Sequence, residues 1–414
     1  MMSVLKICEL AKQASYRQGA YKEHELNTAL LSIAEGLRVN QSAILKENEK
    51  DIQAAIKAGM SQVMLDRLKL TGERVLDMAA GVTSLTFLKS SHGKVLESKV
   101  LENGLTIEKR SVPFGVIGMI YESRPNVTVD AAAIAIKTGN AIVLKGGKEA
   151  IHTNRILVEI MKEALESNGI RPDAIGFIDS VDRTAAAELL TMRGYIDILI
   201  PRGSAGLINW VTKNAQVPVI ETGAGNCHIY VDKDANFTMA LAIIKNAKTQ
   251  RPSVCNAAEK VLVHKEIAES FLAALAREIG DKVTFRVDPL AKAYLKESEL
   301  MLADEYFKEY LDYILGIGIV DDVYGAVDWI NRHSTHHSDA IITDDTIIAD
   351  YFLNIVDSAA VYHNASTRFT DGAEFGFGAE IGIATSKIHA RGPMGLNEMT
   401  TYKYVVIGNG QIRG

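Results

Sequence analysis

Residues 115–149 read GVIGMIYESRPNVTVDAAAIAIKTGNAIVLKGGKE and decide the fold class. Val116–Tyr121 is a short apolar run, residues 126–137 are rich in alanine and end before Gly139, and Ala141–Lys145 is a second apolar run. Short apolar strands joined by a crossover of helical length are typical of a parallel sheet with both faces covered. We therefore predict a doubly wound α/β fold, whose ligands bind beyond the carboxyl ends of the strands.

The alternation continues on both sides of this stretch. Downstream we predict helices over 149–167, 183–192 and 204–213, strands over 174–178, 196–200 and 217–220, and a second α/β block from Cys227. The first 90 residues have the apolar spacing of helices. Asn103-Gly104 lies between alternating runs at 95–101 and 105–110 and predicts a hairpin. Near the end of the chain, 403–407 is a predicted strand without an obvious sequential partner.

Composition narrows the class of protein. The chain has 414 residues, with 45 basic and 51 acidic side chains, so its formal net charge is −6. No excess of Lys and Arg is present to replace phosphate counterions, which argues against nucleic acid as a partner. The longest apolar stretch is far shorter than the roughly 20 residues that span a bilayer. Three cysteines do not form a disulfide framework, so we expect a reduced, cytoplasmic environment and no membrane.

Two loops at predicted strand ends carry the features of phosphate sites. Lys145-Gly146-Gly147-Lys148 precedes a long helix, and cations on such a turn suit a phosphate or a phosphorylated ribose. Gly203-Ser204 follows another strand, where Gly203 lets a pyrophosphate approach the backbone and Ser204 is equally suited to cap the next helix. Because both loops lie on one edge of the predicted sheet, we expect a dinucleotide there, although the usual glycine fingerprint is absent.

Cys255 is the candidate nucleophile. It lies in a polar loop, KTQRPSVCN, with Lys248 and Arg251 nearby, and an electropositive loop favours the reactive thiolate. The alternative is an exposed structural cysteine. Cys8 and Cys227 lie on apolar runs and are predicted to be core residues.

Histidines offer a competing interpretation. His333, His336 and His337 cluster with Asp339, which makes a zinc site conceivable. The HEXXH motif is missing, and adjacent histidines cannot share one face of a strand. We therefore predict no metal.

The motifs together resemble the aldehyde dehydrogenase superfamily. The Cys255 loop, the segment 220–228 (IETGAGNCH) and the strand end at Lys145 occur in its order. Longer stretches at 113–130, 200–206, 251–264, 369–385 and 389–405 resemble a branch that reduces an acyl phosphate in proline biosynthesis. The resemblance implies a Rossmann-like cofactor domain over 1–226 with the hairpin 95–110 in an oligomerisation flap, a catalytic domain over 227–365, and a return over 366–414. The flap would pair the hairpin with the tail strand and make a homo-oligomer.

The resemblance also implies roles for single residues. Cys255 matches the nucleophile, and Asn126 matches an amide that helps to bind the oxyanion. Lys145 matches the lysine of the adenosine ribose, Gly203 and Ser204 match the pyrophosphate loop, and Glu309 matches the carboxylate of the nicotinamide ribose. Glu221 matches the glutamate that activates water in acid-forming relatives. A reductase needs no such water, so the role of Glu221, structural or proton relay, stays open.

Lys148 departs from the family pattern. Many NAD-linked relatives carry an acid here, which accepts a hydrogen bond from the ribose 2′-hydroxyl. A cation at this position attracts a 2′-phosphate instead, so we expect NADPH rather than NADH as the cofactor.

The implied reaction is the reduction of L-glutamyl 5-phosphate to L-glutamate 5-semialdehyde through a Cys255 thioester, with phosphate released. Arg124, Arg251 and Arg391 lie in motif loops and are candidate partners of the anionic substrate, which a glutamate kinase would supply. Two alternatives remain: an aldehyde dehydrogenase that makes a free acid, and a nucleotide-binding regulatory protein whose cysteine is inert.

Overall fold

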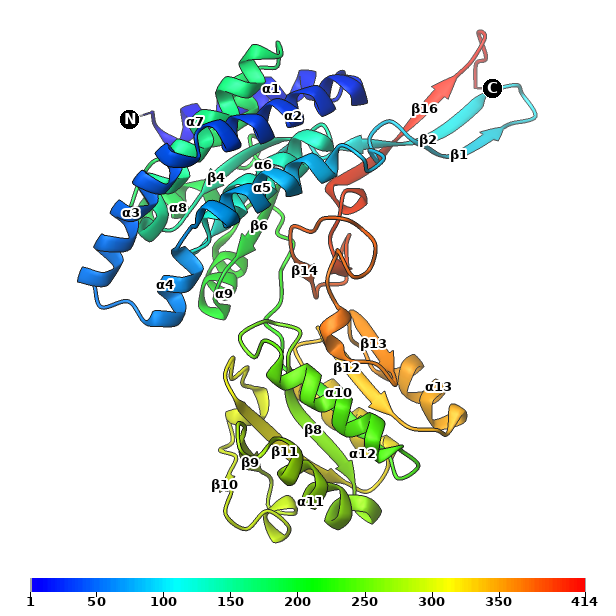
Figure 1. The fold of residues 1–414 in the computed structure, drawn as a ribbon. Coiled ribbons are helices and arrows are strands. Elements are labelled where there is room, and N and C mark those ends of the chain that lie inside the picture. The colour runs from blue at the N-terminus through cyan, green and yellow to red at the C-terminus, as the bar shows by residue number, and fades with distance from the viewer. Residues whose placement is uncertain (1, 414) are drawn as a thin grey trace. The chain divides into compact units, whose positions relative to one another are not determined.

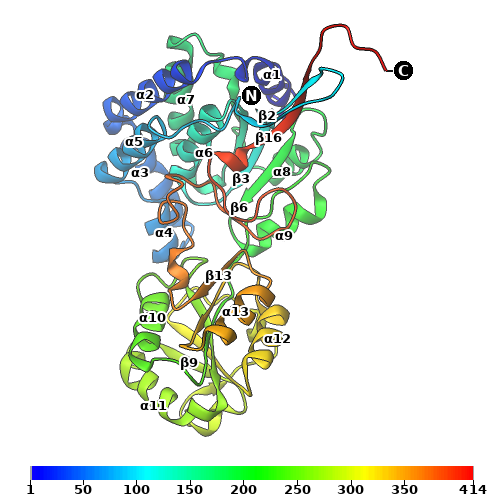
Figure 2. The same cartoon turned by 90° about the vertical axis from the view of Figure 1, so that its right-hand side faces the viewer.

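The computed structural model describes residues 2–413, which form two compact units (Figures 1 and 2). Of the described residues, unit 1 comprises 2–221, 376–382 and 394–413, and unit 2 comprises 222–375 and 383–393. These boundaries differ from the predicted ones at 226/227 and 365/366. Residues 222–226 belong to unit 2 because Thr222 bridges to Ala384 there. Residues 366–375 belong to unit 2 because Thr367 Oγ1 donates to the carbonyl of Asn256, at 2.7 Å.

The core of unit 1 is a parallel sheet in the order β5–β4–β3–β6. Its strands are β3 (Val116–Tyr121), β4 (Ala141–Lys145), β5 (Ile175–Phe177) and β6 (Ile198–Arg202). On the central strand β3, Ile117 is paired with Ile142 of β4 and with Ile198 of β6. The predicted parallel sheet is confirmed. The strand predicted over 217–220 is wrong, since this segment makes only one bridge, between Val219 and Leu199.

Helices of unit 1 agree with the apolar spacing of the sequence. The helices before the sheet are α1 (Val4–Gln18), α2 (Glu23–Val39), α3 (Gln41–Lys57), α4 (Gln62–Leu68) and α5 (Gly72–Leu85). Those between its strands are α6 (Pro125–Lys137), α7 (Ile151–Ser167) and α8 (Arg183–Leu190), and α9 (Ala205–Asn214) follows β6. The alanine-rich α6 is buried along nearly its whole length, because small side chains let other elements pack closely around it.

A separate antiparallel sheet in unit 1 joins distant parts of the chain. It consists of β1 (Val95–Val100), β2 (Thr106–Pro113) and β16 (Thr400–Ile407), in the order β1–β2–β16. The predicted hairpin and the partner expected for the tail strand are both present. Tyr402, Tyr404 and Val406 of β16 are exposed. Figure 1 shows this flap as a ribbon that projects from the helices of unit 1.

Unit 2 contains a second parallel sheet, in the order β10–β9–β11–β8–β7–β12–β13. The strands are β7 (Cys227–Val231), β8 (Ala258–His264), β9 (Thr284–Val287), β10 (Glu299–Leu300), β11 (Ile314–Val320), β12 (Ser338–Ile342) and β13 (Ala360–His363). Alternate side chains of these strands enter two cores. One core includes α10 (Phe237–Thr249) and α11 (Ala268–Ile279), and the other includes α12 (Val323–His333) and α13 (Thr346–Ile355).

None of the helices within residues 2–413 combines the length and the apolar character that a membrane span requires.

Candidate active site

Three strands of unit 1 end beside one another and bring predicted site residues to one edge of its sheet. Ile120 of β3 is paired with Lys145 of β4 and with Pro201 of β6, and all three strands are parallel. Lys145 at the end of β4, Asn126 at the start of the helix after β3, and Gly203 directly after β6 therefore lie at the same edge. This is the edge at which doubly wound sheets bind ligands.

Lys145 is a buried cation at the last position of β4. Its ammonium donates to the carbonyl of Gly146 at 2.9 Å. Burial lowers the pKa of Lys145, while the nearby carboxylates of Glu149 and Asp182 oppose that shift. A buried ammonium at a strand end is well suited to an anionic or hydroxyl-bearing ligand.

Lys148 and Glu149 begin the next helical turn and face different surroundings. The side chain of Lys148 is exposed. The Glu149 carboxylate instead accepts hydrogen bonds from the backbone N–H and the hydroxyl of Ser123, at 2.7 and 2.6 Å. Ser123 has a positive φ of 42°, a conformation that these hydrogen bonds help to hold. The acidic neighbour of Lys148 is thus already engaged within the protein.

Ser204 caps α9, as one of the two sequence interpretations predicted. Its hydroxyl accepts from Leu207 N at 3.3 Å, and its own N–H donates to Glu122 Oε2 at 2.8 Å. A Cβ at Gly203 would press against the same carboxylate and the Leu207 side chain, so a larger residue would have to displace these side chains. In this conformation Glu122 holds the N-terminus of the helix.

Asn126 lies in the first turn of α6, directly after Pro125. Its side chain is exposed, and its amide Nδ2 donates to Asp130 Oδ2 at 2.9 Å, one helical turn later. Proline at the first helical position fixes the backbone here without costing a hydrogen bond. The amide is therefore presented at a helix start and held by a neighbouring carboxylate.

The three cysteines have different environments, as predicted. Cys8 and Cys227 are fully buried. Burial raises the pKa of Cys8 to about 12 and raises that of Cys227 well above its usual value. Cys255 is partly exposed in the loop between α10 and β8. Among the three cysteines, Cys255 alone is not buried, which suits a reactive residue.

The backbone of Gly225 lies against the Cys255 peptide. A Cβ at Gly225 would overlap the Cys255 carbonyl oxygen. That same oxygen accepts a hydrogen bond from the Cys227 thiol at 3.2 Å. The segment 222–227 thus packs against the backbone of the cysteine loop, and only glycine fits at position 225.

Glu309 joins this assembly within unit 2. Its Oε1 accepts from the N–H of Gly225 at 2.9 Å. The structure therefore brings the carboxylate predicted at the nicotinamide ribose to the segment that supports Cys255.

A network of buried charged and polar side chains connects the segments that carry Gly225 and Glu309. The Lys260 ammonium donates to Asn226 Oδ1 at 3.0 Å and to the carbonyl of Lys308 at 2.8 Å, and so links the neighbours of Gly225 and Glu309. Lys248 pairs with Glu259 at 3.2 Å, with both side chains inaccessible. Burial raises the pKa of Glu259 and lowers that of both lysines. Sequence reasoning missed this network. Its signal was the pair of charged residues, Glu259 and Lys260, within the otherwise apolar strand β8.

The predicted substrate arginines differ in their surroundings. Arg391 is held by Asp357, with Nη1 2.9 Å from Oδ1. Arg251 is exposed in the cysteine loop, and Arg124 is the residue before α6.

Sequence reasoning missed Arg368, whose Nε donates to Gln250 Oε1 at 3.0 Å and whose Nη1 donates to Asn256 Oδ1. Glu221 is the last residue of unit 1 before the chain enters unit 2.

The clustered histidines belong to unit 2, where His333 and His336 are partly exposed. His337 is fully buried, and its Nδ1 lies 2.8 Å from Ser338 Oγ. Burial lowers the pKa of His337 to about 4. Asp339 is bonded to the N–H of His228 and to the hydroxyl of Ser334. Within residues 2–413 no three His, Cys, Asp or Glu side chains are arranged to hold a metal ion.

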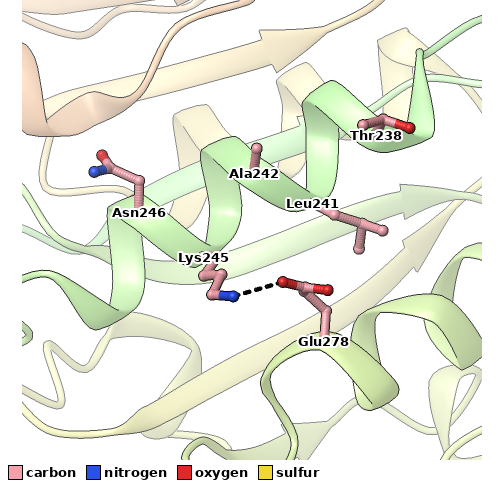
Figure 3. Close-up of a pocket in the computed structure, with 6 residues that line it drawn as sticks. All are labelled: Thr238, Leu241, Ala242, Lys245, Asn246 and Glu278. Atoms are coloured by element: carbon pink, nitrogen blue, oxygen red, sulfur yellow. Dashed lines mark hydrogen bonds and ion pairs between the residues drawn. The ribbon is translucent and has the colours of Figure 1, made fainter.

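A surface pocket of unit 2 involves none of these residues (Figure 3). It lies along α10 and is closed on one side by Glu278 of α11, which pairs with Lys245 at 2.7 Å. Its lining residues are Thr238, Leu241, Ala242, Lys245, Asn246 and Glu278. None of them was predicted as a site residue.

Comparison with known proteins identifies the family. The sequence model of the aldehyde dehydrogenase family matches residues 10–293. Gamma-glutamyl phosphate reductase of Petrotoga mobilis is 50% identical over 410 residues, which cover 99% of each chain. The crystal structure of gamma-glutamyl phosphate reductase from Thermotoga maritima is 42% identical, with a TM-score of 0.97 and full coverage of both chains. An engineered glycolyl-CoA reductase with bound NADP+ shares the fold, with 16% identity, a TM-score of 0.70, and coverage of 98% of this chain and 97% of its own. The chain therefore belongs to the aldehyde dehydrogenase family and groups within it with the gamma-glutamyl phosphate reductases.

Proposed function

We propose that the protein reduces L-glutamyl 5-phosphate to L-glutamate 5-semialdehyde with NADPH and releases phosphate, as a step of proline biosynthesis. One observation carries the proposal. The partly exposed Cys255 lies in a loop against which Gly225 packs, in a chain 50% identical over 99% of its length to a gamma-glutamyl phosphate reductase.

The proposed reaction begins at Cys255. Its thiolate attacks the acyl carbon, the C–O bond to the phosphate breaks, and an acyl thioester forms. Phosphate is a good leaving group, so phosphorylation supplies the driving force that a free carboxylate lacks. The Cys255 N–H and the Asn126 amide would stabilise the negative charge that develops on the carbonyl oxygen. A bound nicotinamide would supply the hydride that reduces the thioester, and the Cys255 thiolate would leave as the aldehyde forms.

The residues of unit 1 fit a nicotinamide dinucleotide, on the condition that Glu122 moves away from Ser204. Lys145 would hold the adenosine ribose, and the exposed Lys148 would attract a 2′-phosphate, since the Glu149 carboxylate is engaged by Ser123. Gly203 and Ser204 would face the pyrophosphate, provided that Glu122 releases the Ser204 N–H, because two anions would repel each other there.

The remaining candidate residues complete the proposal. Glu309 would hold the nicotinamide ribose while Oε1 accepts from Gly225. Arg124 and Arg251 remain the proposed partners of the substrate's anionic groups. Arg391 remains a proposal too, and it would have to share its guanidinium with Asp357. For Glu221 we propose a structural or proton-relay role.

We further propose that the flap makes a homo-oligomer. The exposed Tyr402, Tyr404 and Val406 alternate along β16, an edge strand of the sheet within the described residues. Exposed apolar side chains on a sheet edge favour pairing with another chain. The reduced state of all three cysteines is consistent with our proposal of a cytoplasmic protein, to which a glutamate kinase would supply the acyl phosphate.

The test runs the reaction backwards with glutamate 5-semialdehyde and NADP+. Attack of phosphate on the thioester regenerates the acyl phosphate, so turnover should require phosphate or arsenate. An aldehyde dehydrogenase that makes a free acid would turn over without either anion, and that result would overturn the proposal.

A further inference from the structure

Arg368 spans the base of the cysteine loop. The loop begins at Gln250 and ends at Asn256, and the guanidinium of Arg368 donates to both side-chain carbonyl oxygens. Arg368 belongs to the short 3-10 turn Thr367–Phe369. Three further hydrogen bonds fasten this segment to Asn256. Thr367 Oγ1 donates to the Asn256 carbonyl at 2.7 Å, and Asn256 Nδ2 donates to the carbonyls of Thr370 at 2.9 Å and of Arg368 at 3.3 Å. The position of the guanidinium relative to the loop is therefore defined.

The charge of Arg368 is not balanced by an ion pair. Within residues 2–413, neither of its side-chain hydrogen bonds goes to a carboxylate, and no carboxylate lies within ion-pair distance. Burial lowers the pKa of Arg368, and the positive charge of Arg251 lowers it further, whereas Cys255 and Asp371 oppose the shift. Two guanidinium groups near each other in amide surroundings raise the free energy of the protein, and a bound anion would relieve that repulsion.

The free donor capacity of Arg368 also points to an anion. A guanidinium has five N–H donors in one plane, and the hydrogen bonds described above use only Nε and Nη1. The outer nitrogen Nη2 donates to no other described residue. Arginine binds phosphate oxygens through such pairs of parallel N–H groups.

We propose that Arg368, together with Arg251, forms the subsite for the phosphate group of the acyl phosphate beside Cys255. This inference rests on the proposed function and deepens it. When the Cys255 sulfur bonds to the acyl carbon, the C–O bond breaks and its electron pair leaves with the phosphate. The two guanidinium groups stabilise the additional negative charge on that leaving group, and no oxidant or reductant takes part in this step.

The first experiment needs neither cofactor nor substrate. Cys255 of the full chain is alkylated with iodoacetamide, a neutral reagent, and its modification is followed by mass spectrometry while inorganic phosphate is titrated at constant ionic strength. Phosphate should slow the alkylation of the wild-type protein, whereas glutamate at equal concentration should not, because the subsite is assigned to phosphate rather than to a carboxylate.

Variants separate binding from support of the loop. In Arg368→Gln the phosphate concentration for half-protection should rise about tenfold or more, and Arg368→Lys should recover part of the loss. Arg277→Gln removes the same charge from the exposed face of α11 and should match the wild type. Arg368→Gln could instead change the alkylation rate measured in the absence of phosphate and leave the half-protecting phosphate concentration as in the wild type. In that case Arg368 only supports the loop, and the proposal is wrong. It is equally wrong if phosphate gives no protection, or if glutamate protects as well as phosphate.

A second measurement distinguishes failure of this inference from failure of the proposed function. In the oxidative direction, Arg368→Lys should raise KM for phosphate and leave KM for the aldehyde close to that of the wild type. An unchanged KM for phosphate would overturn the subsite alone. A wild-type enzyme without phosphate-dependent turnover would overturn the proposed function, while the alkylation experiment would still report on the anion site.

Discussion

The backbone of Gly225 lies so close to Cys255 that a Cβ at position 225 would overlap the Cys255 carbonyl oxygen. The same glycine donates its N–H to Glu309 at 2.9 Å. One residue therefore positions both the cysteine loop and the carboxylate expected at the cofactor. Neither relationship is local, because Gly225 is 30 residues from Cys255 and 84 from Glu309 in the sequence.

Gly225→Ala should displace the cysteine loop. The added methyl group cannot be accommodated without moving backbone, and a misplacement of about 1 Å at a reacting group lowers kcat about 100-fold. Steady-state NADPH oxidation measures the effect. The control is Gly81→Ala in α5, where a Cβ meets nothing within 4 Å and should stabilise the helix by up to about 1 kcal/mol. Wild-type kcat in Gly225→Ala would show that the close approach does not matter.

Lys148→Glu should change the preference between cofactors. An acidic side chain repels a 2′-phosphate and accepts from a 2′-hydroxyl, so kcat/KM for NADPH should fall about tenfold while that for NADH stays the same or rises. The measurement compares both reduced cofactors at fixed ionic strength. Equal effects on both would mean that Lys148 does not contact the 2′ position.

The buried pair Lys248–Glu259 should contribute strongly to stability. Lys248→Met leaves the inaccessible Glu259 without this partner, and removal of one member of a buried pair costs about 3 kcal/mol. Lys245→Met is the matched control, because Lys245 lies one turn earlier on α10 and forms an exposed pair with Glu278 (Figure 3). Denaturant unfolding measures both variants. An equal, small loss of unfolding free energy in the two variants would contradict the structural role of the buried pair.

His337 should make the protein less stable in mild acid. Burial lowers its pKa from 6.5 to about 4, so the unfolded chain takes up a proton first as the pH falls. The stability that the neutral ring provides is complete above pH 6.5 and is lost toward pH 4, about 2 kcal/mol of it by pH 5. The free energy of unfolding of His337→Asn should depend less on pH across this window. Parallel curves for the two proteins would refute this assignment.

Much of the fold could be predicted from local sequence. Apolar runs such as Val116–Tyr121 and the Asn103-Gly104 turn determine their strands locally, because burial and turn geometry favour the same conformation. The segment 217–220 has the composition of a strand but makes only one bridge, since strand formation also depends on neighbours that the sequence does not specify.

Site residues could be predicted only where the local sequence around them indicates their role. The polar setting of Cys255 distinguished it from Cys8 and Cys227, whose burial followed from their apolar runs. Arg368 was missed because it reaches the cysteine loop from 113 residues away. The partners of Arg391 and Ser204, namely Asp357 and Glu122, likewise come from other parts of the chain. Periodicity and motif spacing do not report such long-range pairs.

The most direct test of the account is a coupled assay in which a glutamate kinase generates L-glutamyl 5-phosphate in place and NADPH oxidation is followed. The wild-type protein should oxidise NADPH only when kinase, glutamate and ATP are all present, and Cys255→Ala should abolish the reaction while remaining folded. Full turnover by Cys255→Ala, or no kinase-dependent oxidation by the wild type, would contradict it.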